Sequence, residues 1–361
     1  MSGLTPFERT ALVLIAVLTA LAGAADYGAW AVIPRFLLAT LALAGLAWIV
    51  SFATEQLGER FGPGVTGMMQ STLGNLPELF VVIFALQKGE LIVAQTAIIG
   101  SILANALLVL GLVIVVGARR SPNNLMVFSK RLPRDTATLL QVTVFIIVLL
   151  ALSLGAHDPA SHHVKAISVV GAVCLLVVYM AWVVPYLRAD EAPGGGIATP
   201  EDEEALRSPR LSLAATLLLL LGAGAASAFV SDWFVNGLQP AILQLHISQA
   251  FAGLVIVAIA GNAVENTAGL VLAWKGHSDL AISVVKNSVA QIAAFLFPVL
   301  VLVSFALATT LTFALAPVYT GALGLTALAL WQVTGDGEAA EFEGWALVAL
   351  YIILGALTLY E

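Results

Sequence analysis

Charged residues are scarce in this chain: only 10% of its 361 residues are Asp, Glu, Lys or Arg, whereas 60% are hydrophobic. A soluble globular domain carries roughly 25% charged and about 45–50% apolar residues, so a soluble enzyme and a disordered protein are excluded. Lys and Arg number 15 against 22 Asp and Glu, which gives a net charge of −7. No basic surface is available for a nucleic acid. The composition indicates an integral membrane protein with several spans.

Cysteine and histidine are also rare. The single cysteine, Cys174, excludes an intramolecular disulfide and has no metal-ligand spacing. The apolar stretches contain no Ser–His pair, no paired aspartates and no zinc motif. An intramembrane enzyme is therefore not expected, and no cofactor is expected either.

Long apolar runs are abundant instead. Eleven stretches are each close to the ~20 residues that a helix needs to cross hydrocarbon, and none alternates as a barrel strand does. They cover residues 9–28, 31–53, 64–87, 91–117, 136–155, 164–187, 211–233, 248–274, 280–306, 309–332 and 343–360. The predicted fold class is an all-α integral membrane protein with about 11 transmembrane helices.

Basic residues predict the orientation, because they favour cytoplasmic loops. Strict alternation of the stretches places eleven of them on one side: Arg9, Arg60, Arg119, Arg120, Lys130, Arg131, Arg134, Arg188, Arg207, Arg210 and Lys275. We therefore expect a cytoplasmic N-terminus and an external C-terminus. The Ala- and Arg-rich composition favours a bacterial inner (plasma) membrane.

An internal repeat relates residues 74–105 to residues 261–292 without gaps, at an offset of 187. The identical pairs include Gly74/Gly261, Asn75/Asn262, Glu78/Glu265 and Ser101/Ser288. Gly-Asn-x-x-Glu thus recurs in the middle of two stretches, and each Glu is followed 23 residues later by a Ser. The turn within the first copy falls outside and that within the second copy falls inside, so the two copies are inverted.

Inverted repeats with polar groups near the membrane midplane are typical of secondary transporters. The chain is then organised as one extra helix and two inverted five-helix repeats. We predict the extra N-terminal helix at 1–30, the first half at 31–187, an acidic cytoplasmic linker at 188–210 and the second half at 211–361.

Glu78 and Glu265 are the only carboxylates deep within predicted spans. A charged side chain there costs roughly 2.5–3.5 kcal/mol on insertion scales, and intramembrane acids mark ion or proton paths. Helical spacing places Asn75 with Glu78 and Asn262 with Glu265 on one face. On the following spans, Ser101 lies four residues before Asn105, and Ser288 lies three residues before Gln291.

All these groups offer oxygen ligands, which suit hard cations such as Ca²⁺. Two ionised glutamates carry −2, which one divalent cation neutralises. Without the cation, two like charges raise each other's pKa, so protons bind instead. Competition between cation and protons for the same carboxylates predicts exchange.

The first copy of the repeat resembles the first signature repeat of the calcium/proton exchanger family, within the cation/Ca²⁺ exchanger superfamily. The residues that carry this resemblance are 74–79, 95–105 and 108–111. The second copy resembles the family's second signature repeat at residues 261–265, 288, 291–292 and 298–300. The resemblance implies alternating access, in which Glu78 and Glu265 bind Ca²⁺ and protons. The companion polar residues would be Asn75, Ser101, Asn105, Asn262, Ser288 and Gln291.

Three positions depart from the family pattern. Asn266 stands where the family usually has His, Asn287 where it has Gly, and Lys286 where it has an apolar residue. If the Lys286 ammonium reaches the site, the summed charge becomes −1, which disfavours Ca²⁺. The simpler interpretation is that Lys286 snorkels to the cytoplasm, because it lies 200° around the helix from Ser288.

The leading hypothesis is therefore a Ca²⁺/H⁺ antiporter in the lipid bilayer, with inorganic cations and protons as its only predicted small partners. A Na⁺ or K⁺ exchanger coupled to H⁺ or Ca²⁺, with a site charge altered by Lys286, is the alternative. A transport-inactive sensor is a minor alternative. The sequence leaves a homo-oligomer open.

Overall fold

A computed structural model describes residues 4–58, 60, 73–121, 123–129, 131–190 and 210–361. For residues 58, 131–134, 186–190, 264 and 265 it describes the backbone alone. Most of the predicted linker, residues 191–209, lies outside the described part of the chain.

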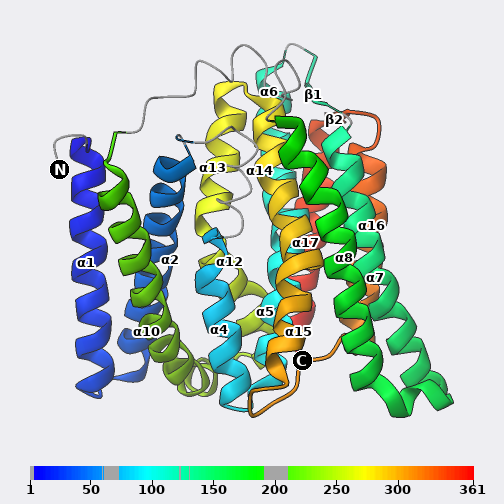
Figure 1. The fold of residues 1–361 in the computed structure, drawn as a ribbon, viewed down its shortest axis with the longest axis horizontal. Helices are drawn as coiled ribbons and strands as arrows, with labels where there is room; N and C mark the ends of the chain where they lie inside the picture. Colours follow the sequence, from blue (N-terminus) through cyan, green and yellow to red (C-terminus); the bar gives the residue numbers. More distant parts are fainter. Residues whose placement is uncertain (1–3, 59, 61–72, 122, 130, 191–209) are drawn as a thin grey trace. The chain divides into compact units, whose positions relative to one another are not determined.

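Helices make up nearly all of the described structure (Figure 1). The elements are α1 (Pro6–Tyr27), α2 (Val32–Gly58), α4 (Leu76–Gln87), α5 (Leu91–Leu103), η1 (Ala104–Val109), α6 (Leu110–Arg120), β1 (Leu125–Val127), α7 (Arg131–Ala156), η2 (Pro159–His163), α8 (Val164–Asp190), α10 (Leu213–Leu245), α11 (Gln249–Phe251), η3 (Ala252–Val257), α12 (Ala258–Gly261), α13 (Ala263–Lys275), α14 (Ser278–Gln291), η4 (Ile292–Leu296), α15 (Phe297–Ser304), α16 (Pro317–Thr334), β2 (Glu338–Ala340) and α17 (Glu341–Leu359).

Within the described ranges, eight helices are long and apolar enough to cross a membrane. A ninth span results if Gln249–Gly261 and Asn266–Lys275, which meet at a bend of 55°, are counted as one. The predicted all-α membrane fold is therefore confirmed. The count of eleven stays a prediction, since part of the stretch 64–87 lies outside the described residues.

Two predicted boundaries are wrong. The stretch 309–332 becomes helical only at Pro317, because residues 305–316 form a non-helical segment. Leu311 and Phe313 in this segment are fully buried, and their backbone N–H groups donate to the hydroxyls of Ser304 and Ser168. Buried apolar side chains outside a helix thus mimic the composition of a span. The stretch 211–233 is also too short, because α10 continues to Leu245.

The described residues cluster into two compact units, which combine segments from distant parts of the chain. Unit 1 comprises Met1–Phe84, Met180–His246 and Ala260–Val264, and unit 2 comprises Ala85–Tyr179, Ile247–Ile259 and Glu265–Glu361.

In unit 1, α10 packs along α2, and α1 contacts both of them (Figure 1). Close to one end of α1, the Trp233 indole on α10 packs against Gly23, where a Cβ would lie 2.8 Å from the ring. Tyr27 adds an edge-to-face contact with the same ring at 5.8 Å. Glycine is required at position 23 because the indole occupies the space of a side chain.

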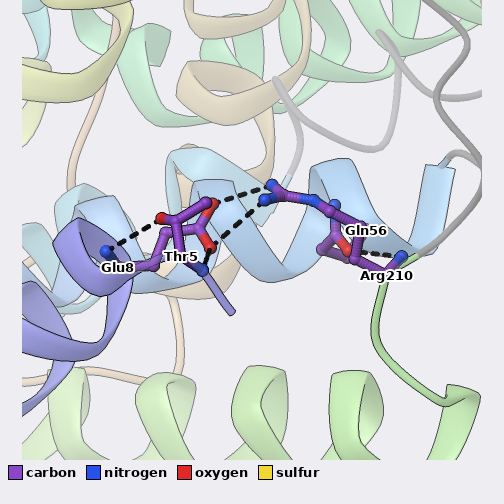
Figure 2. Close-up of polar contacts among 4 residues, drawn as sticks. All are labelled: Thr5, Glu8, Gln56 and Arg210. Atoms are coloured by element: carbon purple, nitrogen blue, oxygen red, sulfur yellow. Dashed lines mark hydrogen bonds and ion pairs between the residues drawn. The ribbon is translucent and has the colours of Figure 1, made fainter. Parts of the chain in front are cut away.

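The other end of α1 is fastened by an ion pair. The Arg210 guanidinium donates to both carboxylate oxygens of Glu8, at 2.7 and 3.2 Å, and the Arg210 backbone N–H donates to Gln56 (Figure 2). Glu8 and Thr5 form a capping box that starts α1. Nearby, Leu4, Phe52 and Leu211 form a small apolar cluster. The chain that follows the linker is thus tied to α1 and α2.

In unit 2, close helix crossings are made at glycines. A Cβ on Gly111 of α6 would lie 2.6 Å from the carbonyl oxygen of Gly344 on α17, and a Cβ on Gly344 would approach the Gly111 carbonyl equally. Helix α7 packs on α16, and α5 packs on η3. Strands β1 and β2 pair antiparallel, with Met126 opposite Ala339.

The glycine crossing of α6 and α17 gives a stability prediction. Gly111→Ala should lower the free energy of unfolding by about 1–3 kcal/mol, because the added methyl group meets backbone that cannot rotate away. Gly321→Ala on α16 is the matched control, since its Cβ would meet nothing within 4 Å. Thermal unfolding of the purified protein in detergent measures both. Equal melting temperatures for Gly111→Ala, Gly321→Ala and wild type would contradict the crossing.

Candidate functional site

Glu78 is a buried carboxylate at the start of a helix in unit 1. The backbone is non-helical at Asn75, and α4 begins directly afterwards with Glu78 as its third residue. Pro77 fits there because a first helical turn needs no N–H at that position. Glu78 is 1% exposed. The positive end of the helix dipole at the α4 N-terminus stabilises negative charge on this side chain.

A segment 184 residues further along the chain contributes to the surroundings of Glu78. The Asn262 side-chain amide donates to Glu78 Oε1 at 3.0 Å, and both groups are buried. A Cβ on Gly261 would lie 3.4 Å from Glu78 Cγ and Oε1. Glycine at position 261 therefore lets the carboxylate lie close to the backbone. Unit 1 thus brings Glu78 into contact with Asn262, and Asn75, three residues before Glu78, is 5% exposed.

Asn262 occupies the same local position in its repeat as Asn75 does in the first. It is the non-helical residue between α12 and α13. Glu265 is then the third residue of α13, as Glu78 is of α4. The Glu265 side chain lies outside the described residues, so its predicted role stays a prediction.

Four further predicted residues are buried in unit 2. Ser101, Asn105, Ser288 and Gln291 are each at most 1% exposed. The Asn105 side-chain amide donates to the Ser288 hydroxyl at 3.2 Å and to the Ser101 carbonyl at 3.1 Å. The first repeat is therefore joined directly to the second through an amide and a hydroxyl. Such neutral oxygens can ligate a hard cation.

Both helices of this cluster change to π-helix where the polar residues lie. Segment η1 begins after Leu103, and η4 begins after Gln291. Residues 292–296 of η4 correspond to residues 105–109 of η1 at the repeat offset of 187. π-Helical turns are rare and frequently mark functional sites. Hydropathy and helical period did not predict them, and the repeat offset is the signal that relates one to the other.

Lys286 does not snorkel to the cytoplasm, so the simpler of the two sequence interpretations is wrong. Its side chain is fully buried, and Nζ donates to the Thr334 hydroxyl of α16 at 2.9 Å. Thr334 in turn donates to the Leu330 carbonyl at 2.6 Å. Ser288 on α14 contacts η1, whereas Lys286 on α14 contacts α16, so α14 is held through opposite faces. Lys286 lies near the C-terminus of α16, where the helix dipole favours positive charge.

In the described part of the chain, unit 1 contains a buried carboxylate beside an amide, and unit 2 contains a separate group of buried amides and hydroxyls. No group of three or more His, Cys, Asp or Glu side chains is placed there to hold a metal ion. Broken helices that carry a buried acid and neutral oxygens are the arrangement of secondary transporters. Fold and site together therefore define a membrane ion carrier.

Comparison with known proteins identifies the family. The model of the sodium/calcium exchanger protein family matches residues 32–186 and 215–360. The vacuolar calcium ion transporter of Schizosaccharomyces pombe is 32% identical over 321 residues, which cover 88% of this chain and 77% of that protein. A Ca(2+)/H(+) antiporter of Synechocystis sp. is 30% identical over 356 residues, 95% of each chain. The chain belongs to the sodium/calcium exchanger protein family, and its resemblance to the calcium/proton exchangers is confirmed.

Solved structures show the same fold. The structure of native YfkE has a TM-score of 0.79 at 24% identity, and the match covers 97% of this chain and 100% of that one. A structure of the H⁺/Ca²⁺ exchanger CAX has a TM-score of 0.71 at 15% identity and covers 98% and 93%. The protein is thus an integral membrane protein with the exchanger fold.

The contact between Lys286 and Thr334 gives a stability prediction. Thr334→Val should destabilise the protein by about 1–3 kcal/mol, because it leaves a buried amine without its acceptor. Lys286→Met should be neutral or stabilising, since an apolar group replaces a buried polar one. In the double variant, Lys286→Met should therefore rescue Thr334→Val.

Thermal unfolding in detergent measures these effects, and Thr334→Ser, which keeps the hydroxyl, is the control. A double variant as unstable as Thr334→Val alone would show that the amine does not depend on Thr334.

Proposed function

We propose that this protein is a secondary transporter that exchanges Ca²⁺ for H⁺. The two relatives named above are described as a vacuolar calcium ion transporter and a Ca(2+)/H(+) antiporter, and both match most of this chain. The observation that carries the proposal is the burial of Glu78 beside Asn262, an acid from one repeat with an amide from the other. A buried acid needs either a cation or a proton to be neutralised.

The exchange follows from charge. Glu78 and Glu265 together offer −2, which one Ca²⁺ or two protons can neutralise. Each carboxylate that binds a proton loses its attraction for Ca²⁺, so the two substrates compete. An empty site with two negative charges is costly to carry across hydrocarbon. Only the loaded forms then re-orient, and transport becomes obligatory exchange by alternating access.

Neutral oxygens complete the proposed cation site. Ca²⁺ takes six to eight oxygen ligands, more than two carboxylates supply. We assign the additional oxygens to Asn75, Asn262, Ser101, Asn105, Ser288 and Gln291. All six are buried, and the contact of Asn105 with Ser288 supports the assignment for unit 2.

Exchange of Na⁺ or K⁺ in place of Ca²⁺ is the second candidate, and the burial of Lys286 favours keeping it. A charged amine inside unit 2 reduces the negative charge available to a divalent ion. If Na⁺ or K⁺ drives proton movement and Ca²⁺ does not, Lys286→Leu should restore the response to Ca²⁺. A protein that transports none of these ions, although it binds Ca²⁺, would instead be a sensor.

The first functional prediction concerns the two glutamates. In proteoliposomes that are acidic inside, external Ca²⁺ should drive proton release and Ca²⁺ uptake. Glu78→Gln and Glu265→Gln should each reduce this exchange at least about a hundredfold, because a neutral amide can neither release a proton nor offset the Ca²⁺ charge. Lumenal pH and ⁴⁵Ca²⁺ uptake measure it.

Glu338→Gln is the matched control, since Glu338 is exposed on β2. Exchange that persists in either glutamate variant at the rate of this control would remove that carboxylate from the mechanism.

We also propose a cytoplasmic N-terminus and an external C-terminus in a bacterial plasma membrane, on the distribution of Lys and Arg. In a Cys174→Ser background, His163→Cys should react with an impermeant maleimide added to intact cells, whereas Ser121→Cys should react only after lysis. His163 is the last residue of the short helical segment η2, and Ser121 directly follows α6. The reverse labelling pattern would invert the topology.

A further inference from the structure

Two arginines end α6, and each lies over the ring of an exposed tryptophan. The Arg119 guanidinium is 5.8 Å from the ring centroid of Trp345 on α17, and the Arg120 guanidinium is 5.3 Å from that of Trp274 on α13. The two tryptophans are 45% and 66% exposed. A cation over the face of an indole is attracted by the ring, so both arginines are held beside accessible aromatic rings of unit 2.

The charge of Arg119 is compensated within the fold, whereas that of Arg120 is not. Arg119 forms an ion pair with Glu341 at 2.7 Å. Arg120 donates to the backbone carbonyl of Trp274 and has no acidic partner among the described residues. A guanidinium carries five N–H donors, so Arg120 keeps donors for an anion from outside the chain.

A second cation lies next to Trp274. Lys275 ends α13, and it is exposed together with Gly276 in the turn that leads to α14. A Cβ on Gly276 would meet nothing within 4 Å, so no described segment covers this turn. Arg120, Trp274 and Lys275, which we call the basic patch, therefore combine two cations with an aromatic ring on an open surface.

The inverted repeat supplies an internal comparison for this surface. The turn between α4 and α5 corresponds to the turn between α13 and α14, and both pass through a glycine of positive φ, +82° and +87°. The first turn carries Gln87 and Glu90 at the positions of Trp274 and His277. The same backbone thus forms without an aromatic ring and with an added acid. The turn itself does not require the features of the second copy.

We propose that the basic patch binds the phosphate of an anionic phospholipid. Arg120 and Lys275 are the last residues of two candidate membrane spans. Tryptophan at the end of a span lies at the level of the lipid headgroups, and guanidinium groups bind phosphate oxygens through paired N–H donors. Clusters of basic residues at helix ends recognise anionic headgroups.

The bound lipid would connect the C-terminal ends of α6 and α13, which belong to different repeats. This site is separate from the proposed cation site, and it does not depend on which ion the protein carries.

Phosphatidylglycerol is the probe that tests the proposal. Native mass spectrometry of the purified protein in detergent measures the dissociation constant of the first bound lipid. Arg120→Gln and Lys275→Gln should each weaken binding about fivefold, and the double variant about twenty-five-fold, because each basic residue near the membrane surface contributes a similar attraction. Binding of phosphatidylcholine, which has no net charge, should be weaker and should not change in these variants.

Lys165→Gln is the matched control, because it removes an exposed cation at the start of α8, outside the basic patch. It should leave the dissociation constant for phosphatidylglycerol unchanged. Gel filtration and melting temperature identify a variant that fails to fold. If Arg120→Gln fails, Lys275→Gln alone decides, since Lys275 is exposed in the turn.

Three results would overturn the proposal. The first is wild-type affinity for phosphatidylglycerol in the folded variants. The second is an equal loss of affinity for phosphatidylcholine, which would show that the charge of the headgroup is not recognised. The third is displacement of phosphatidylglycerol from the wild type by inorganic phosphate, which would identify free phosphate as the ligand.

Discussion

A carboxylate inside the hydrocarbon layer must be compensated, and much of the local structure around Glu78 follows from that need. An uncompensated charge there costs roughly 2.5–3.5 kcal/mol on insertion scales. Three features reduce this cost in unit 1: the N-terminus of α4, the amide of Asn262, and the close approach of the backbone at Gly261. None of them neutralises the charge. In the proposed exchange, a cation or a proton neutralises this acid.

Breaks in the helices position the polar groups around Glu78. A continuous α-helix satisfies its own backbone and presents only side chains, whereas a break at Asn75 or Asn262 creates helix termini inside the protein. The π-helical segments η1 and η4 also interrupt their α-helices. Asn105 lies within η1, and Gln291 directly precedes η4. Polar groups are thus placed by irregular backbone, which a membrane protein tolerates only where it is buried or lines a cavity.

Much of this could be predicted from the sequence, because hydropathy and repeat identity are local signals. The apolar stretches indicate where most helices lie, and the recurrence of Gly-Asn-x-x-Glu singles out Glu78 and Asn262, which are in contact in the structure. The helical period also placed Lys286 correctly on the face opposite Ser288. The hydrogen-bond partner of Lys286 could not be predicted, because that partner, Thr334, lies 48 residues away in the chain. The segment 305–316 was missed for a similar reason: its apolar side chains are buried by tertiary contacts instead of by lipid.

The two repeats have diverged in polarity, since Asn105 of the first copy corresponds to Ile292 and other positions differ in the opposite sense. At three corresponding positions the first copy has an apolar residue or glycine, Leu79, Ile99 and Gly100, and the second has Asn266, Lys286 and Asn287. Two identical inverted halves would make the inward- and outward-facing states equivalent in energy by symmetry. Buried polar groups without a counterpart in the other half remove that equivalence, because a buried amide or amine is stabilised only in the state that supplies its partner. In the proposed alternating access, the asymmetry between the two repeats therefore gives the two states different energies.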